Sequence, residues 1–346
     1  MIHVYRNKKQ EDILKNMDSK NQAKFALFAQ NAQILKKPFK WHDTLPKGLA
    51  ALLYAVENKT VDCEAINESL NLIKHSVGVF SAFRGSMSLC IASMLSLKSE
   101  KRRIFSDTLT VYDMMKKAKF RASEYLAIAA YQIAANATHD SFDQTIGRAK
   151  KFYDGMKKKR WFLTGEDDYI FATMLGLSEL DVKTGVEKIE ALYQQLKLHF
   201  QPKNSVQNLA QILVLGGECE EAAKRLLKLH EALRGQKMRL DKTYTLPAMG
   251  VLALLPVDAD TIVKDIAYAK DFLRVQKGFG SLYISMQELL LLVSSIVAAN
   301  YAEEFKDGII TASLSTSITG IIIAQQTAVI MAAASAGAAA AASASH

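Results

Sequence analysis

The residues Glu-Tyr-Leu-Ala-Ile-Ala-Ala-Tyr-Gln-Ile-Ala, numbered 124–134, decide the fold because apolar patches like this one recur along the chain. Six such patches begin 37 to 44 residues apart, at Leu89, Leu126, Ile170, Leu209, Ala248 and Leu289. Before each patch lie an amphipathic helical segment that carries lysines and a short turn. A repeat of this length is typical of stacked helical hairpins, in which each unit buries its apolar face against its neighbours.

The repeat predicts an all-α fold, a superhelical array of about six helical hairpins similar to an α-solenoid. Only five prolines and 17 glycines interrupt the 346 residues, and no sustained alternation of β-branched or aromatic residues with polar ones indicates a strand. We expect an N-terminal helical cap at 1–60, the hairpin array at 61–302, and an uncharged, Ala/Ser-rich C-terminal helix and tail at 303–346. The second helices of the hairpins, such as 124–135 and 244–255, are the more apolar set, and we expect them to line the buried or concave side.

The composition is that of an ordinary globular protein, with 49% apolar and 23% charged residues. Three scattered cysteines without a CxxC pair favour a reducing compartment. The first ten residues are polar and lack the apolar segment of a secretory signal. We therefore expect a cytoplasmic protein.

The formal charge of +9 is concentrated in basic runs at 98–103, 116–121 and 148–160. Such runs could attract nucleic acid or anionic lipid. The lysines at 116–119 and 157–159 fall at the ends of predicted helices, where cations complement the helix macrodipole. Acidic residues are interspersed and no aromatic platform accompanies the lysines, so we do not expect a nucleic-acid partner.

An acidic turn at 164–169 is the strongest local candidate for chemistry. Glu166, Asp167 and Asp168, followed by Tyr169, could bind a divalent cation or transfer protons. The alternative is structural and is the one we favour: Thr164 with Asp167 three residues later resembles a capping box, and acids in a first turn are stabilised by the macrodipole. No nucleotide, zinc, calcium or nucleophile motif occurs in the chain, so no cofactor or metal is predicted.

A second candidate is the turn that contains Phe80, Phe83 and Arg84. Two aromatics and an arginine could bind an anion or anchor a residue of a partner. The favoured alternative is that both aromatics staple the hairpin while Arg84 stays solvated. Trp161 and Phe162 occupy the equivalent turn of another hairpin, which again favours stapling.

The C-terminal segment from Gly308 to Ser345 contains no Asp, Glu, Lys or Arg, and its apolar residues follow helical spacing. An uncharged run of this length raises the question of a membrane anchor. Gln325 and Gln326 in its middle, and its many Ser, Thr and Ala residues, argue against one. We expect a helix that closes the end of the array or pairs with a partner helix.

Several separated segments resemble one uncharacterised bacterial family, known only as domain of unknown function 4003. These segments are VFSAFRG (79–85), EYLAIAAYQIA (124–134), FLTGEDDY (162–169), LPAMGVLALL (246–255), QKGFG (276–280) and IIIAQQTAVIMAAASA (321–336). The resemblance spans about Ala50 to the C-terminus. It implies a bacterial cytosolic protein, and it transfers no activity and no catalytic residue.

The leading hypothesis for function is a non-catalytic interaction scaffold that binds a peptide or protein partner on a helical-repeat surface. Two alternatives remain open. One is an enzyme or small-ligand binder whose site lies inside the curved array and uses the 166–169 turn with Arg84. The other is membrane association through Ile309–Ala342.

Overall fold

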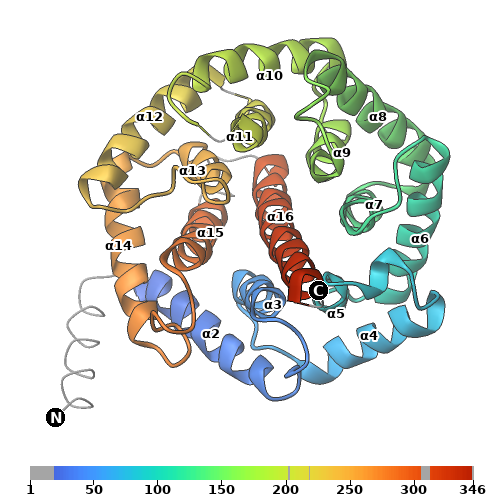
Figure 1. The fold of residues 1–346 in the computed structure, drawn as a ribbon, viewed down its shortest axis with the longest axis horizontal. Coiled ribbons are helices and arrows are strands. Elements are labelled where there is room, and N and C mark those ends of the chain that lie inside the picture. The colour runs from blue at the N-terminus through green and yellow to red at the C-terminus, as the bar shows by residue number, and fades with distance from the viewer. Residues whose placement is uncertain (1–18, 202, 218, 305–311, 345–346) are drawn as a thin grey trace.

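The protein is a closed toroid of seven helical hairpins with one further helix along its centre (Figure 1). The computed structural model describes residues 19–344 except 202, 218 and 305–311. The outer layer is made of α2 (Ser19–Lys36), α4 (Cys63–Ser76), α6 (Lys101–Lys117), α8 (Phe142–Lys159), α10 (Val182–Leu196), α12 (Cys219–Gly235) and α14 (Ala259–Val275). The inner layer is made of α3 (Thr44–Val56), α5 (Ser88–Ser96), α7 (Glu124–Asn136), α9 (Tyr169–Leu177), α11 (Lys203–Leu215), α13 (Leu246–Ala253) and α15 (Met286–Glu304). The central helix is α16 (Ala312–Ala344), and short 3-10 turns are η1 (Ala82–Arg84), η2 (His139–Ser141) and η3 (Glu166–Asp168).

The two layers follow from two kinds of helix in the sequence. The outer helix α10 is amphipathic, and it buries one stripe that includes Val186, Ile189 and Tyr193 while its lysines face solvent. The inner helix α9 is buried at every position from Tyr169 to Gly176, because it lies between the outer layer and the centre of the toroid. The prediction of an all-helical array is therefore confirmed, and the more apolar second helices form its buried side.

The array closes on itself, which the repeat alone did not predict. The hairpin α2–α3, from the region expected to be an N-terminal cap, packs between α14–α15 and α4–α5 as the seventh unit of the ring (Figure 1). The buried Lys24 ammonium pairs with the Glu303 carboxylate at 2.6 Å, and the rings of Phe28 and Phe279 lie 5.5 Å apart. Closure leaves no free end to the described array.

The charge-free helix α16 fills the centre of the ring instead of covering one end of an open array (Figure 1). It packs against α3, α7, α9, α11, α13 and α15, and residues 320–330 are buried except for the half-buried Ala328. Its Ile321, Ile322 and Ile330 belong to the main hydrophobic core. A segment without charges suits this place because a buried charge without a partner is costly.

Two glycines of one hairpin provide a matched test of its packing. A Cβ on Gly176 of α9 would lie 2.8 Å from the backbone nitrogen of Ala149 and 2.9 Å from the Thr145 carbonyl oxygen, both in α8. We expect Gly176→Ala to lower the free energy of unfolding by about 1–3 kcal/mol, because backbone atoms cannot yield locally. Gly147→Ala in α8, where nothing lies within 4 Å, should raise it by about 0.5–1 kcal/mol. Chemical denaturation of both variants measures the difference, and equal effects would contradict the close α8–α9 packing.

Candidate docking face and interior polar site

All inner helices begin on the same face of the toroid, and hydrogen bonds connect their starts around the ring. The Met87 amide donates to Glu124 at 2.7 Å, joining the starts of α5 and α7. Asn204 of α11 donates to Asp167 before α9 at 2.7 Å. We call this face, formed by the connections 37–43, 77–87, 118–123, 160–168, 197–201, 236–245 and 276–285, the basic face.

The charge of the basic face follows from the direction of the outer helices, which all end on it. The basic residues in their last turns are Lys36, Lys74, His75, Lys116, Lys117, Lys157, Lys158, Lys159, Arg234 and Arg274. On the opposite face, α4, α10 and α14 begin with Asp62, Asp181 and Asp258 as N-caps. This arrangement complements the macrodipoles of most outer helices, although α6 begins with Lys101, Arg102 and Arg103 and α10 has no basic residue in its last turn. The basic residues in the last turns give the toroid one basic face.

The basic face also carries the exposed large hydrophobic residues of the described chain. They are Trp41, Val79, Phe80, Trp161, Phe162, Leu198, Tyr244, Leu282, Tyr283 and, at the start of α15, Met286. They come from six of the seven outer-to-inner connections, and Phe80, Trp41 and Leu282 are 103%, 88% and 94% exposed. Protein surfaces in water normally carry such residues singly and scattered, so their restriction to one face makes this face the candidate interaction surface.

Helix α16 emerges from the ring through this same face. Its Val329, Ala332 and Ala336 line a hollow with the starts of α13 and α15, whereas Thr319 and Ile323 lie among the ends of α3, α5 and α7. Beyond Ala332, the described side chains are mostly exposed. The segment Thr319–Gly337 is long and apolar enough to cross a membrane, yet 56% of it is buried inside the ring, so it serves as a core helix here.

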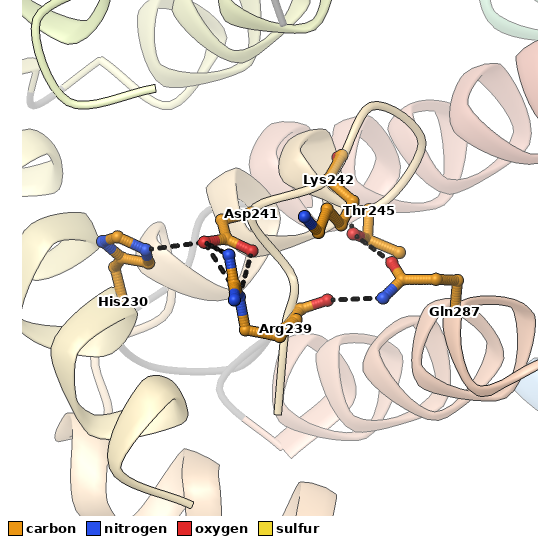
Figure 2. Close-up of polar contacts among 6 residues, drawn as sticks. All are labelled: His230, Arg239, Asp241, Lys242, Thr245 and Gln287. Carbon is orange, nitrogen blue, oxygen red and sulfur yellow. Dashed lines mark hydrogen bonds and ion pairs between the residues drawn. The ribbon is translucent and has the colours of Figure 1, made fainter. Parts of the chain in front are cut away.

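The connection between α12 and α13 shows how the basic face is held in place (Figure 2). Asp241 accepts hydrogen bonds from Arg239 at 2.9 Å and faces the His230 ring nitrogen at 3.3 Å. Burial of this carboxyl works against ionisation, but the bonds from Arg239 and His230 outweigh it and lower the pKa of Asp241. Gln287 of α15 donates to the Arg239 carbonyl at 3.1 Å and bonds Thr245. The connection that exposes Tyr244 is thus tied to helices on both sides.

The acidic turn predicted from the sequence lies at the start of α9, and Asp168 is its buried centre. Its carboxylate is fully buried and accepts from the Gly165 amide at 2.9 Å and from the Gln207 and Gln211 side chains at 3.0 and 2.6 Å. Burial and the neighbouring Asp167 charge raise the pKa of Asp168 to about 7, against the effect of these bonds. Asp168 therefore joins α9 to α11.

The expected capping box of Thr164 with Asp167 is wrong by one residue, because the acid that accepts the Gly165 amide is Asp168. Thr164 instead accepts from Gln207 at 3.2 Å. Asp167 points to Asn204 and lines a pocket on the basic face, and Glu166 is half-buried beside it.

Tyr169 is a core residue at the α6–α7 junction. Its hydroxyl accepts from the Arg121 amide at 3.1 Å, and its ring packs at 4.9 Å from Phe120 and 5.1 Å from Tyr153. Its side chain is buried within the hairpin packing, so it does not face the pocket that Asp167 lines.

The other predicted turn separates into a core residue and an exposed one. Phe83 is buried and packs edge to face at 5.1 Å from Tyr112 and 5.7 Å from Phe105, so it does staple the hairpin. Phe80, Trp161 and Phe162 are exposed, and the expectation that they also act as staples is wrong. Arg84 is half-buried in η1, and no described contact joins it to the acids near α9.

Sequence reasoning missed the interior polar residues. Gln207 and Gln211 are buried inside the ring, and the only signal for them was their position within a partly apolar helix. Gln325, noted from the sequence only as evidence against a membrane anchor, is buried there as well. Among the described residues, no three His, Cys, Asp or Glu side chains are grouped so that they could hold a metal ion.

No curated protein and no solved structure matches the chain. A family model described as "Protein of unknown function (DUF4003)" matches residues 31–327, which includes all the hairpin helices from α3 to α15 and most of the buried part of α16. The match therefore covers most of the toroid and of its central helix, and the chain belongs to the DUF4003 family.

Proposed function

We propose that this protein is a non-catalytic scaffold that docks the basic face of its toroid on an anionic membrane surface. The observation that carries the proposal is that all the large hydrophobic side chains exposed in the described chain lie on the face where the outer helices end in lysine and arginine. Aromatic and basic residues together are typical of proteins that bind at the headgroup region.

The distribution of apolar residues favours lipid over nucleic acid or an acidic protein. Leu198 and Leu282 are aliphatic and project from separate connections, and neither can stack on a base. The charge-free α16 leaves the ring on this face, so an uncharged helix lies beside the aromatic and basic residues of the basic face.

The state of the inner surface favours membrane docking over a peptide partner held inside the array. In the structure that surface is covered by α16, and the predicted acids and Arg84 do not converge there. This supports the basic face as the docking surface.

The test is flotation of the full chain with vesicles of phosphatidylcholine, with and without phosphatidylglycerol. We expect binding only to the anionic vesicles, weakened by salt because exposed charges are screened. Replacing Lys158 and Lys159 by Glu should weaken binding at least tenfold, since each basic residue near the surface contributes about 1 kcal/mol. The matched control reverses Arg102 and Lys183, exposed on the opposite face, and should bind like the wild type.

A second variant separates the apolar contribution from the charge. Replacing Trp161 and Phe162 by Ser should weaken vesicle binding while the remaining binding keeps its salt dependence. The proposal fails if the wild type stays in solution with anionic vesicles, or if both charge-reversal pairs behave alike. Binding to an acidic protein or to nucleic acid in place of vesicles would likewise overturn it.

A further inference from the structure

A small pocket of about 250 Å³ opens beside α16 where α7, α9, α11 and α13 begin. Its polar lining comes from the starts of four hairpins and from α16: Tyr125, Asp167, Asn204, Ser205, Asn208, Thr243, Tyr244 and Gln325. Convergence of polar groups from four hairpins and the central helix in one hollow is the usual form of a small-ligand site.

Two of these side chains are buried and carry polar atoms without a hydrogen-bond partner. Gln325 is 3% exposed, and neither its amide nitrogen nor its amide oxygen is bonded. Asn208 is 7% exposed, and its amide oxygen is unbonded. Because buried polar groups are almost always paired, these groups point to a polar ligand that completes their bonds.

The charge of the lining selects the class of ligand. Asp167 is its charged residue, and no Lys, Arg or His belongs to the described lining. The Asp167 carboxylate keeps one oxygen beyond the bond from Asn204, and the Asn208 and Gln325 oxygens add further acceptors. Such a site repels anions and suits a cation that carries several hydrogen-bond donors. The rings of Tyr125 and Tyr244 can also attract an ammonium group through cation–π interactions.

We propose that this pocket binds a small organic ammonium compound that also carries hydroxyl groups. Its ammonium group donates to Asp167, and its other polar groups bond Asn208 and Gln325. This site goes beyond membrane docking and is independent of it, since it can be occupied in solution without vesicles.

The test is calorimetric titration of the full chain with glucosamine and with glucose, which differ by one ammonium group. We expect glucosamine to bind at least tenfold more tightly than glucose, because only the ammonium forms a charge-assisted bond to Asp167. Asp167→Asn should remove this preference. The matched control Glu187→Gln, the same change at an exposed site on α10, should keep it.

Gln325→Met, which keeps the length of the side chain and removes its amide, should weaken glucosamine binding without lowering the melting temperature. Equal binding of the two sugars, or an unchanged preference in Asp167→Asn, would show that the pocket holds only water and would overturn the proposal.

An ammonium group could also come from a lipid headgroup, and a second arm distinguishes this source. Phosphatidylglycerol vesicles are compared with and without phosphatidylethanolamine. If phosphatidylethanolamine strengthens vesicle binding and Asp167→Asn abolishes this increase, the ligand is a lipid headgroup. If glucosamine binds but phosphatidylethanolamine does not strengthen vesicle binding, the ligand is a soluble amine. Absence of both responses, with vesicle docking intact, overturns the pocket proposal alone.

Discussion

A chain that ends at Glu304, without α16, should lose on the order of 5 kcal/mol of its free energy of unfolding. The removed helix buries Ile321, Ile322, Ile323 and Ile330 in the centre of the ring. Burial of one such side chain is worth about 1.5–3 kcal/mol, part of which offsets the entropy of ordering the helix. Chemical denaturation gives the loss, and binding of an apolar dye should reveal the uncovered inner helices.

The control for this truncation is a chain that ends at Ala336. It keeps the buried residues 320–330 and removes only residues after Ala336, of which 337 and 339 are exposed. We expect its stability to change by less than about 0.5 kcal/mol. If the chain that ends at Glu304 were as stable as this control, α16 would not be part of the core.

Replacement of Asp168 by Ala should lower the free energy of unfolding by about 3 kcal/mol or more at pH 5. The substitution leaves the amide groups of Gln207 and Gln211 and the backbone amide of Gly165 without their acceptor, and each unpaired buried donor costs ~1–3 kcal/mol. The measurement is denaturation at pH 5, where the acid is still protonated in the folded state.

The same residue should give the protein a characteristic dependence on pH. The pKa of Asp168 is about 7 when folded, above its ordinary value of 3.8. Between these values the folded state binds more protons than the unfolded state, so stability falls as the pH rises, by up to ~1.4 kcal/mol per pH unit. Asp168→Asn should flatten this slope between pH 4 and 7.

Other groups titrate in the same range, so the wild type and Asp168→Asn are compared at each pH. Burial also raises the pKa of Asp167, which adds a slope of the same sign, and burial lowers the pKa of His42, which opposes it. The His42 contribution cancels in the difference between the two proteins, whereas the difference reports Asp168 together with its coupling to Asp167. A difference that stays constant from pH 4 to 8 would show that Asp168 is ionised in the folded state throughout.

The hairpins could be predicted from the sequence because their signal is local. An amphipathic α10 and an α9 that is apolar on every side each follow from a few consecutive residues. At the acidic turn the bonds of Asp168 run to Gln207 and Gln211 on the next hairpin, which is a contact that the local sequence does not encode.

Closure and the basic face could not be predicted in the same way. The Lys24–Glu303 pair joins residues 279 positions apart, and no periodicity encodes such a contact. Phe80 and Phe83 are near neighbours of the same type in one turn, yet one is fully exposed and the other is buried against Tyr112. Only the direction of the hairpin in three dimensions decides between them.

Closure through α2 and α15 has a consequence for synthesis on the ribosome. The hairpin α2–α3 leaves the exit tunnel before α15 has been made, so Lys24 cannot pair with Glu303 until α15 has also emerged. Helix α16 follows α15 in the chain. Nascent chains would therefore pass through an open arc with two unpaired edges and an uncovered inner wall, the kind of species that aggregates or recruits chaperones. That exposure ends when α16 packs into the centre of the ring.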